Sequence, residues 1–365
     1  MNTPLNANPA AWRYKALIGT GGIGSGTFFA LKGDHTLGRE ESRAGRFLDR
    51  RDYCKLHIIE HYVAVLLGTS FETIAIGRVG DDEPGHRMIA EMREAGISVR
   101  RVEVVPGEQT LYSICFVYPD GTGGNLTVDD SASQKVDPAL IRTAEPDFAR
   151  LVGTGMTLAA PEVPLEARAE LLRLGRKYRF FNTAAFTSGE LQTIRTGGRA
   201  ASGTPAPGST LAADMLKMVD FLAINIHEAA TLAGVPADQP PERIVEAATD
   251  TLRSIQPAMR FSVTAGQRGS WTWDGESLSF NPAFRVDIVN TAGAGDSFMA
   301  GMIVGIAAGL SLLDAQQLAT LIAGMKVTCI HTINKEIDRD TLRRFAGRVR
   351  APLTGGVRRL LEDQA

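Results

Sequence analysis

The segment best suited to chemistry lies at residues 287–298, with the sequence DIVNTAGAGDSF. Its Gly- and Ala-rich turn leads directly into an apolar run from Phe298 to Leu310, which predicts a buried helix. Small residues let backbone N–H groups approach a ligand closely, and the free N–H groups and dipole of a helix N-terminus favour an anion. The turn therefore predicts an anion site formed by the backbone of Gly293, Ala294 and Gly295.

Asp296 lies in the first turn of the same helix. A carboxylate repels phosphate, so its presence in an anion site requires another task, and accepting a proton from an attacking hydroxyl is one. Phosphoryl transfer needs alignment, N–H donors, a cation and a base near the nucleophile. This turn could supply the donors and the base. The alternative is that Asp296 is an ordinary acidic residue at the start of a helix.

A second polar pair, Asn225 and Glu228, follows an apolar strand predicted at Phe221–Asn225. Open α/β sheets bind ligands at the carboxyl ends of their strands. An amide and a carboxylate at this place could order the water shell of Mg²⁺, which gives up its waters reluctantly. We therefore expect both residues to hold Mg²⁺ through water, although Glu228 could also be a simple first-turn acid of a helix.

The elements that position these residues alternate along the chain. Apolar strand candidates and helical patterns follow one another from residue 151 onward, which predicts a mostly parallel sheet covered on both faces, and hence an α/β fold. The strand candidates are 151–153, 179–182, 221–225 and 261–264. Short β-type runs at 99–128 precede them, including a hairpin that pairs 113–118 with 126–129.

Composition excludes several classes of function. The chain has 365 residues and a formal net charge of −2, so there is no broad electrostatic basis for binding nucleic acid or an anionic membrane. The longest apolar run is too short to span a bilayer, and the N-terminus lacks the pattern of a signal peptide. Three widely spaced cysteines indicate reduced thiols and a cytoplasmic protein.

Residues 291–296, TAGAGD, resemble the signature of the ribokinase-like (PfkB) carbohydrate kinases. Three further segments resemble family motifs in the expected order: a glycine signature at 77–85, an NxxE motif at 225–228 and a strand-end loop at 263–269. The resemblance implies an ATP-dependent kinase that phosphorylates a hydroxyl of a sugar-like molecule and uses Mg²⁺.

In such a kinase Asp296 would be the catalytic base, and the preceding backbone would form the anion hole. The resemblance also implies that Asn225 and Glu228 organise the metal and the phosphates. The residues Thr264, Gly266 and Gly269 would line the nucleotide groove.

The resemblance covers roughly residues 70–335 and implies one ribokinase-like domain at 14–350, between a flexible tail at 1–13 and a C-terminal segment at 351–365. A small β-sheet lid would use strands from about 20–50 and 99–129. A homodimer formed through the lid is one arrangement that the resemblance allows.

The chain departs from the family where the acceptor is normally held. Cys54 and Lys55 stand where the family has two glycines, and Ile59 stands where it has an Asn. The Asp that usually follows the first strand is missing. We assign Asp34, Lys55 and His57 to the acceptor side in their place. The acceptor stays open between a sugar, a sugar phosphate and a nucleoside, and a catalytically silent sensor that binds a sugar or a nucleotide is a second class of function.

Two departures concern the nucleotide half. Asn290 replaces the first Asp of the family's DTxGAGD motif, so we do not expect activation by K⁺. Residues 331–334, HTIN, replace a Gly-Ala pair that lies beside the adenine in other members, which leaves the adenine contacts open.

Two other motifs suggest different functions. A GxGxxG pattern at 19–24 is typical of dinucleotide-binding folds, but the glycines and charged residues that follow do not continue such a fold, so we interpret it as a Gly-rich wall beside the substrate. The HxxEH pattern at 57–61 would place two His on one helix face. A zinc site would need a third ligand that the sequence does not locate, and an ordinary helix face is the preferred interpretation.

Overall fold

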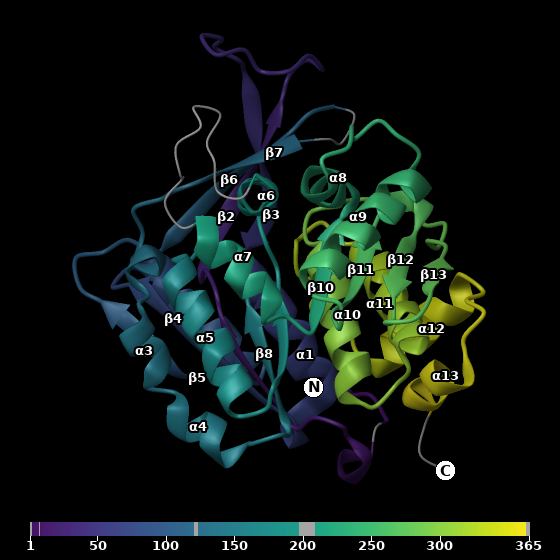
Figure 1. The fold of residues 1–365 in the computed structure, drawn as a ribbon. Helices are drawn as coiled ribbons and strands as arrows, with labels where there is room; N and C mark the ends of the chain where they lie inside the picture. Colours follow the sequence, from purple (N-terminus) through teal and green to yellow (C-terminus); the bar gives the residue numbers. More distant parts are fainter. Residues whose placement is uncertain (1, 7, 120–122, 197–208, 363–365) are drawn as a thin grey trace.

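The computed structural model describes residues 2–6, 8–119, 123–196 and 209–362 and contains two β-sheets (Figure 1). The large sheet has nine strands in the order β13-β12-β11-β10-β9-β8-β1-β4-β5. Neighbours from β5 to β11 pair in parallel, while β12 and β13 are antiparallel. The α/β fold with a mostly parallel central sheet is thus confirmed. The strands are β1 (Ala16–Thr20), β4 (Glu72–Gly80), β5 (Ser98–Val105), β8 (Gly155–Ala159), β9 (Phe181–Ala184), β10 (Phe221–Asn225), β11 (Arg260–Thr264), β12 (Ser270–Trp273) and β13 (Leu278–Asn281).

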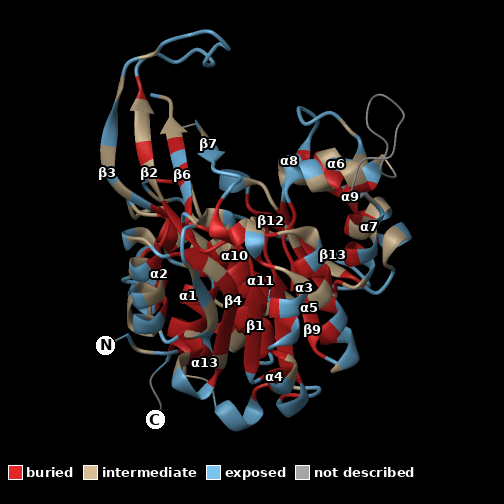
Figure 2. Ribbon diagram, turned by 90° about the vertical axis from the view of Figure 1, so that its left-hand side faces the viewer, coloured by how far each residue is buried: buried red, intermediate tan, exposed pale blue. Residues whose placement is uncertain are grey.

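Helices cover both faces of this sheet and enclose two apolar cores. Alternate residues of a strand face opposite sides, so Leu17 of β1 joins one core while Ala16 and Ile18 join the other. Figure 2 shows the buried strands β1 and β4 in the interior of the molecule. The first core uses α1 (Lys55–Leu67), α2 (Glu83–Glu94), α10 (Ala294–Ala307), α11 (Leu312–Lys326), α12 (Arg339–Arg348) and α13 (Gly355–Leu361). The second uses α3 (Pro138–Arg142), α4 (Glu145–Arg150), α5 (Leu165–Lys177), α6 (Ser188–Arg195), α7 (Ser209–Lys217), α8 (Ile226–Ala233) and α9 (Pro241–Ile255).

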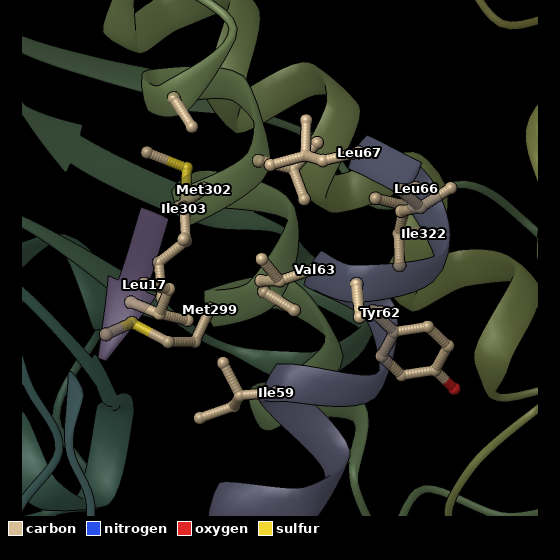
Figure 3. Close-up of a cluster of buried hydrophobic side chains, with 14 of the residues drawn as sticks. Leu17, Ile59, Tyr62, Val63, Leu66, Leu67, Met299, Met302, Ile303 and Ile322 are labelled. Atoms are coloured by element: carbon tan, nitrogen blue, oxygen red, sulfur yellow. The ribbon is translucent and has the colours of Figure 1, made fainter. Parts of the chain in front are cut away.

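The packing of α1 against α10 positions the two helix N-termini that matter for the site. Ile59 and Val63 of α1 lie beside Met299 and Ile303 of α10 in the first core (Figure 3). On its other side α10 approaches α11 closely, because a Cβ at Gly301 would come within 2.5 Å of the Ala319 Cα. Apolar contacts therefore fix the positions of both helices relative to each other.

The second sheet is small and lies over the end of the large sheet (Figures 1 and 2). Its order is β3-β2-β6-β7, from β2 (Gly24–Leu31), β3 (Gly45–Tyr53), β6 (Leu111–Val117) and β7 (Gly123–Thr127). The predicted hairpin at 113–118 and 126–129 is present as β6 and β7. One part of the expected lid range is placed differently, because residues 98–105 form β5 and pair in parallel with β4 in the large sheet. Residues 120–122 lie outside the described part.

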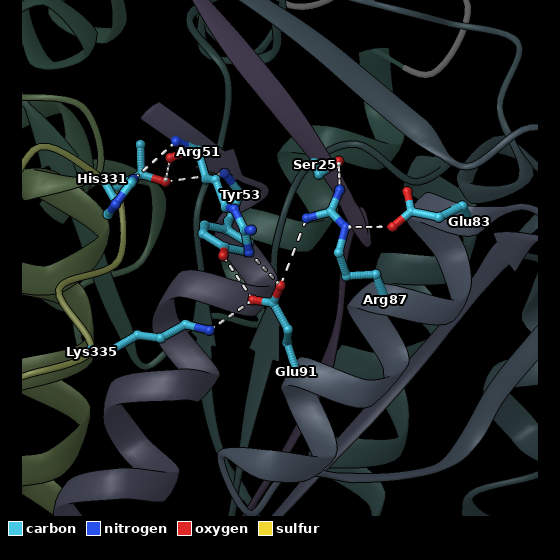
Figure 4. A network of polar contacts seen from close by, with 9 residues as sticks. Ser25, Arg51, Tyr53, Glu83, Arg87, Glu91, His331 and Lys335 are labelled. Carbon is cyan, nitrogen blue, oxygen red and sulfur yellow. Dashed lines mark hydrogen bonds and ion pairs between the residues drawn. The ribbon is translucent and has the colours of Figure 1, made fainter. Parts of the chain in front are cut away.

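A network around Glu91 of α2 anchors the base of the lid (Figure 4). The Glu91 carboxylate accepts hydrogen bonds from the Tyr53 hydroxyl at 2.7 Å and the Lys335 ammonium at 3.0 Å. Arg51 forms an ion pair with the same carboxylate at 3.2 Å. The network joins β3 of the lid to α2 and to the segment that follows α11.

The two chain ends are packed against the domain. The Leu5 N–H donates to the Leu66 carbonyl at 2.8 Å. The Trp12 ring packs edge-on against the Phe71 ring, with the two ring centroids 5.8 Å apart. Leu361 of α13 is buried in the first core. The described parts of 1–13 and 351–365 are therefore in contact with the domain, which the sequence did not predict. Residues 1, 7 and 363–365 lie outside the described part.

Candidate active site

A cleft of about 910 Å³ separates the small sheet from the strand ends of the large sheet. Asp296 and Lys55 line it, and the same two residues also line a smaller adjoining pocket. The cleft receives side chains from the lid and from the turn before α10, while the small pocket receives side chains from the ends of β10 and β11. Asp296 therefore lies where two compartments meet.

The turn before α10 presents three backbone N–H groups that have no acceptor within the described part of the chain: those of Gly293, Gly295 and Asp296. Gly293 caps the helix with φ 77°, and a Cβ there would lie 2.7 Å from the Thr332 carbonyl oxygen. Ala294 differs from our expectation. Its N–H donates to the Thr291 carbonyl at 3.1 Å, because the tight turn brings that carbonyl over it. Of the three predicted amides, those of Gly293 and Gly295 are therefore free to meet a ligand, and that of Ala294 is not.

Lys326 of α11 supports this turn from behind. The residue is fully buried, and its ammonium donates to the Asn290 carbonyl at 2.9 Å and also to the Ala292 carbonyl. The Asn290 side chain adds two bonds, donating to the Ile330 carbonyl at 2.8 Å and accepting from the Ala292 N–H at 3.1 Å. Burial lowers the pKa of Lys326 to about 8. A cationic side chain therefore holds two carbonyls of the turn in place.

Lys55 is the acceptor-side residue that the structure does bring to Asp296. It begins α1, and its Nζ lies 3.6 Å from Asp296 Oδ1. The Asp296 carboxylate, followed by those of Glu228 and Glu162, raises the pKa of Lys55 against the opposing effect of burial. A positive charge is thus kept beside the acid at the junction of the two pockets.

Asn225 and Glu228 line the small pocket and cap α8 reciprocally. Asn225 Oδ1 accepts from the Glu228 N–H at 2.9 Å, and Glu228 Oε2 accepts from the Asn225 N–H at 2.9 Å. Burial is the main cause that raises the pKa of Glu228. Within the described ranges, no group of three or more His, Cys, Asp or Glu residues could hold a metal. Mg²⁺ often keeps its waters and binds one or two carboxylates plus substrate phosphates, and these residues fit that role.

Some residues at the end of β11 and in the loop after it line a pocket, and others determine the shape of the loop. Thr264 lines the small pocket, and Gln267 lines the large cleft. Gly266 and Gly269 line neither pocket and instead shape the loop. Gly269 has φ 115°, and a Cβ there would lie 2.2 Å from the Asn281 carbonyl oxygen, so only glycine fits.

Two predicted acceptor residues are not brought to the site. His57 is buried in α1 with its ring 4.9 Å from that of Tyr53, and burial lowers its pKa to about 4. It lies two residues after Lys55, which puts it on a different face of the helix. Asp34 is exposed in the β2–β3 connection. Neither residue lines the cleft.

The two competing motifs also lack support from the geometry. His57 and His61 lie with ring centroids 6.4 Å apart, but the described residues supply no third metal ligand. The glycines of the 19–24 pattern do not line the cleft, so they are not the expected wall beside the substrate.

Several cleft residues were missed from the sequence. Asp52 of β3 accepts a hydrogen bond from the Cys115 thiol at 3.2 Å, and burial raises its pKa. Glu162 lies three residues after the end of β8, and its Oε2 is buried without a partner. The strand-end rule that identified Asn225 could also have found Glu162. Arg46 and Arg50 line the cleft from β3.

Glu162 gives a prediction about pH and stability. Burial raises its pKa from 4.5 to about 7, so between these values the folded protein holds a proton that the unfolded chain has released. Proton binding at Glu162 therefore adds about 3 kcal/mol to the free energy of unfolding below pH 4.5. This contribution is lost as the pH rises from 4.5 to 7. Urea denaturation should find Glu162→Gln more stable than the wild type at pH 8 and similar to it at pH 4.5. Equal differences at both pH values would contradict a buried, protonated Glu162.

The chain matches the model of one kinase family and is similar to ribokinases of known sequence. The family described as pfkB family carbohydrate kinase matches residues 62–339. Ribokinase of Schizosaccharomyces pombe is 27% identical over 256 residues, which cover 69% of this chain and 72% of that protein. Ribokinase of Bacillus subtilis is 24% identical over 282 residues, covering 72% of this chain and 84% of the relative.

Solved structures share the fold. Ribokinase from Cryptococcus neoformans in complex with ADP superposes with a TM-score of 0.69 at 17% identity, covering 92% of this chain and 99% of that chain. The Burkholderia thailandensis nucleoside kinase in complex with inosine gives a TM-score of 0.68 at 14% identity, covering 91% and 97%.

Proposed function

Because the chain belongs to the pfkB family of carbohydrate kinases and is an ATP-dependent sugar kinase, we propose that Asp296 takes the proton from the acceptor hydroxyl that receives the γ-phosphoryl group. One observation carries this proposal. Asp296 shares a single helix turn with free backbone N–H groups and lies between a large cleft under the lid and a small pocket at the strand ends.

In the proposed phosphoryl transfer, Asp296, the backbone N–H groups and Mg²⁺ have different roles. The acceptor lies in the large cleft with one hydroxyl beside Asp296. Its oxygen bonds to the γ-phosphorus of ATP while the bond from that phosphorus to the ADP oxygen breaks, and the proton passes to the carboxylate. The N–H groups of Gly293, Gly295 and Asp296 stabilise the charge on the transferring group. Bound Mg²⁺ would neutralise phosphate charge, held through water by Glu228 and Asn225.

Two lysines have supporting roles in this proposal. Lys55 supplies a positive charge at the junction where phosphate and acceptor meet. Lys326 keeps the turn in the shape that leaves its N–H groups free. Closure of the lid over the acceptor would exclude water, which otherwise competes for the phosphoryl group.

We place the protein in the cytoplasm. No helix of the described ranges has the length and apolar character needed to cross a membrane. All three cysteines are free thiols, which suits a reducing compartment. Finding the protein in a membrane or secreted fraction would contradict this placement.

The outer face of the small sheet favours a homodimer. Phe47 and Leu126 are 67% and 63% exposed on the face opposite the cleft, and Ile114 opposes Leu126 across the β6–β7 pair. Exposed apolar groups concentrated on one sheet face are typical of an interface. A second copy that applies the same face would cover them.

The dimer is tested with Leu126→Glu, which places a charge on this face at the edge strand β7. Light scattering at about 20 µM protein should find a dimer for the wild type and a monomer for the variant. Leu278→Glu, at an exposed leucine of β13, serves as the control and should stay dimeric. A monomeric wild type would reject the dimer.

The acceptor class is tested by measuring ADP release with sugars, sugar phosphates and nucleosides. Turnover that requires one of them would support the kinase, and preference for a nucleoside would make it a nucleoside kinase. Tight ATP binding without turnover of any acceptor would instead favour a sensor.

A further inference from the structure

We propose that the acceptor carries an anionic group, a phosphate ester or a carboxylate, and that Arg50 and Arg46 of the lid bind this group while Asp296 meets a hydroxyl at the other end of the molecule. This inference rests on the proposed kinase function and adds the chemical class of its acceptor.

The alternation of β3 is the first observation. Arg46, Leu48, Arg50 and Asp52 all line the cleft, although the pairing of β3 with β2 is irregular at residues 49–50. The residues between them take the other face, where Phe47 is exposed and Arg51 pairs with Glu91. Two arginines of this highly charged strand are therefore directed at the acceptor space.

The second observation is that these two arginines have no acidic partner within the described ranges. Neighbouring arginines are satisfied, since Arg43 pairs with Glu41 at 2.7 Å and Arg51 pairs with Glu91 at 3.2 Å. A guanidinium presents a planar fork of N–H donors that matches both carboxylate and phosphate. Two such forks facing one cleft provide a site for an anion on the ligand.

The third observation is how charge is distributed along the cleft. Its acidic groups are Asp52 at the end of β3, Glu162 just after β8, and Asp296 in the first turn of α10. Arg50 lies two residues before Asp52, at an irregularity in the pairing of β3 with β2, and Arg46 lies four residues farther from Asp52 along the strand. Lys55 pairs with Asp296 at 3.6 Å, so the cleft has mixed charge near the reacting hydroxyl and only positive charge at Arg46 and Arg50 of the lid.

This spacing fits a particular kind of molecule. A sugar chain of five or six carbons can place one hydroxyl near Asp296, further hydroxyls near the carboxylates of Asp52 and Glu162, and a terminal anion near Arg50. A neutral sugar would offer neither guanidinium group an anionic partner. A volume of about 910 Å³ leaves room for the added group.

The test compares each neutral hexose or pentose with its terminal phosphate monoester and its aldonic acid. Both ADP release and binding by titration calorimetry are measured on the full-length protein. We expect one of the two series, the phosphate monoesters or the aldonic acids, to bind at least ~10-fold more tightly than the neutral sugars. Charge-assisted hydrogen bonds allow a difference of this size. The two anionic series decide between a phosphate and a carboxylate.

Substitutions of single arginines test which of them binds the anionic group of the acceptor. Arg50→Met should raise KM for the anionic acceptor at least ~10-fold with little change in kcat, and Arg46→Met should raise it less. Arg50→Lys should recover part of the loss, since it keeps the charge but not the fork. Arg39→Met, at an exposed arginine of the β2–β3 connection, is the control and should behave as the wild type.

Failure of every anionic compound to exceed its neutral counterpart in binding or turnover would overturn the inference. So would an Arg50→Met variant with an unchanged KM. Both results are compatible with efficient phosphorylation of a neutral sugar, in which case the proposed function stands. Absence of turnover with every acceptor would count against the kinase itself, while selective binding of one anionic series would still support the arginine site.

Discussion

Replacing Asp296 by Asn should lower kcat at least ~10²-fold while ATP binding persists. The amide nearly preserves the size of the side chain but cannot accept the proton of the acceptor hydroxyl. The free N–H groups of Gly293 and Gly295 stay in place, so the phosphate site should survive. Steady-state kinetics give kcat, and titration with ATP gives the binding constant.

A matched variant separates catalysis from helix stabilisation. Asp314 occupies the first turn of α11, where it interacts with a helix dipole as Asp296 does, but it does not line the cleft. Asp314→Asn should therefore leave kcat unchanged. If the two variants lost equal activity, or if Asp296→Asn kept wild-type turnover, Asp296 would be a structural residue at a helix start.

The second large effect is expected at Lys326. Lys326→Ala removes the ammonium that binds the Asn290 and Ala292 carbonyls, so two buried acceptors lose their partner at about 1–3 kcal/mol each. The turn should relax, and kcat should fall at least ~10-fold, more than KM for the acceptor changes. Chemical denaturation measures the loss of stability, and kinetics measure the split between kcat and KM.

Recovery of kcat by an added cation would show whether the charge of Lys326 positions the turn or its side chain only fills space. The alanine variant leaves a space lined by carbonyl oxygens, which is an environment that accepts small cations. Ammonium ion should restore part of its kcat, whereas Lys326→Met, which fills the space without charge, should not respond. The wild type should turn over equally in K⁺ and Na⁺, as the Asn290 replacement suggests. A wild type activated by K⁺, or an alanine variant with normal kcat, would contradict this role of Lys326.

Local patterns were sufficient to predict the elements that hold the site. The turn at 291–296 and the strand end at Asn225 obey rules that act within a few residues, so their positions follow from the chain itself. The lid was predictable only in part. The run at 98–105 has the β-type composition of the lid, but it follows α2 closely and completes a parallel β–α–β unit in the large sheet.

The missed residues depend on contacts between distant segments. Mixed charge at residues 38–52 is typical of a solvated face, and only the fold shows that alternate side chains of β3, including Arg50 and Asp52, face the cleft. Lys326 lies 34 residues after Ala292, so no local pattern could identify its partners. His57 was misassigned because its distance from Lys55 along the helix, rather than its chemistry, decides which way it faces.

The most direct measurement is a crystal structure of the protein with a non-hydrolysable ATP analogue. We expect oxygens of the terminal phosphate to lie ~2.9 Å from the N–H nitrogens of Gly293 and Gly295, with the Asp296 carboxylate facing the space beneath the lid. A terminal phosphate bound away from this turn, with Asp296 directed out of the cleft, would contradict it.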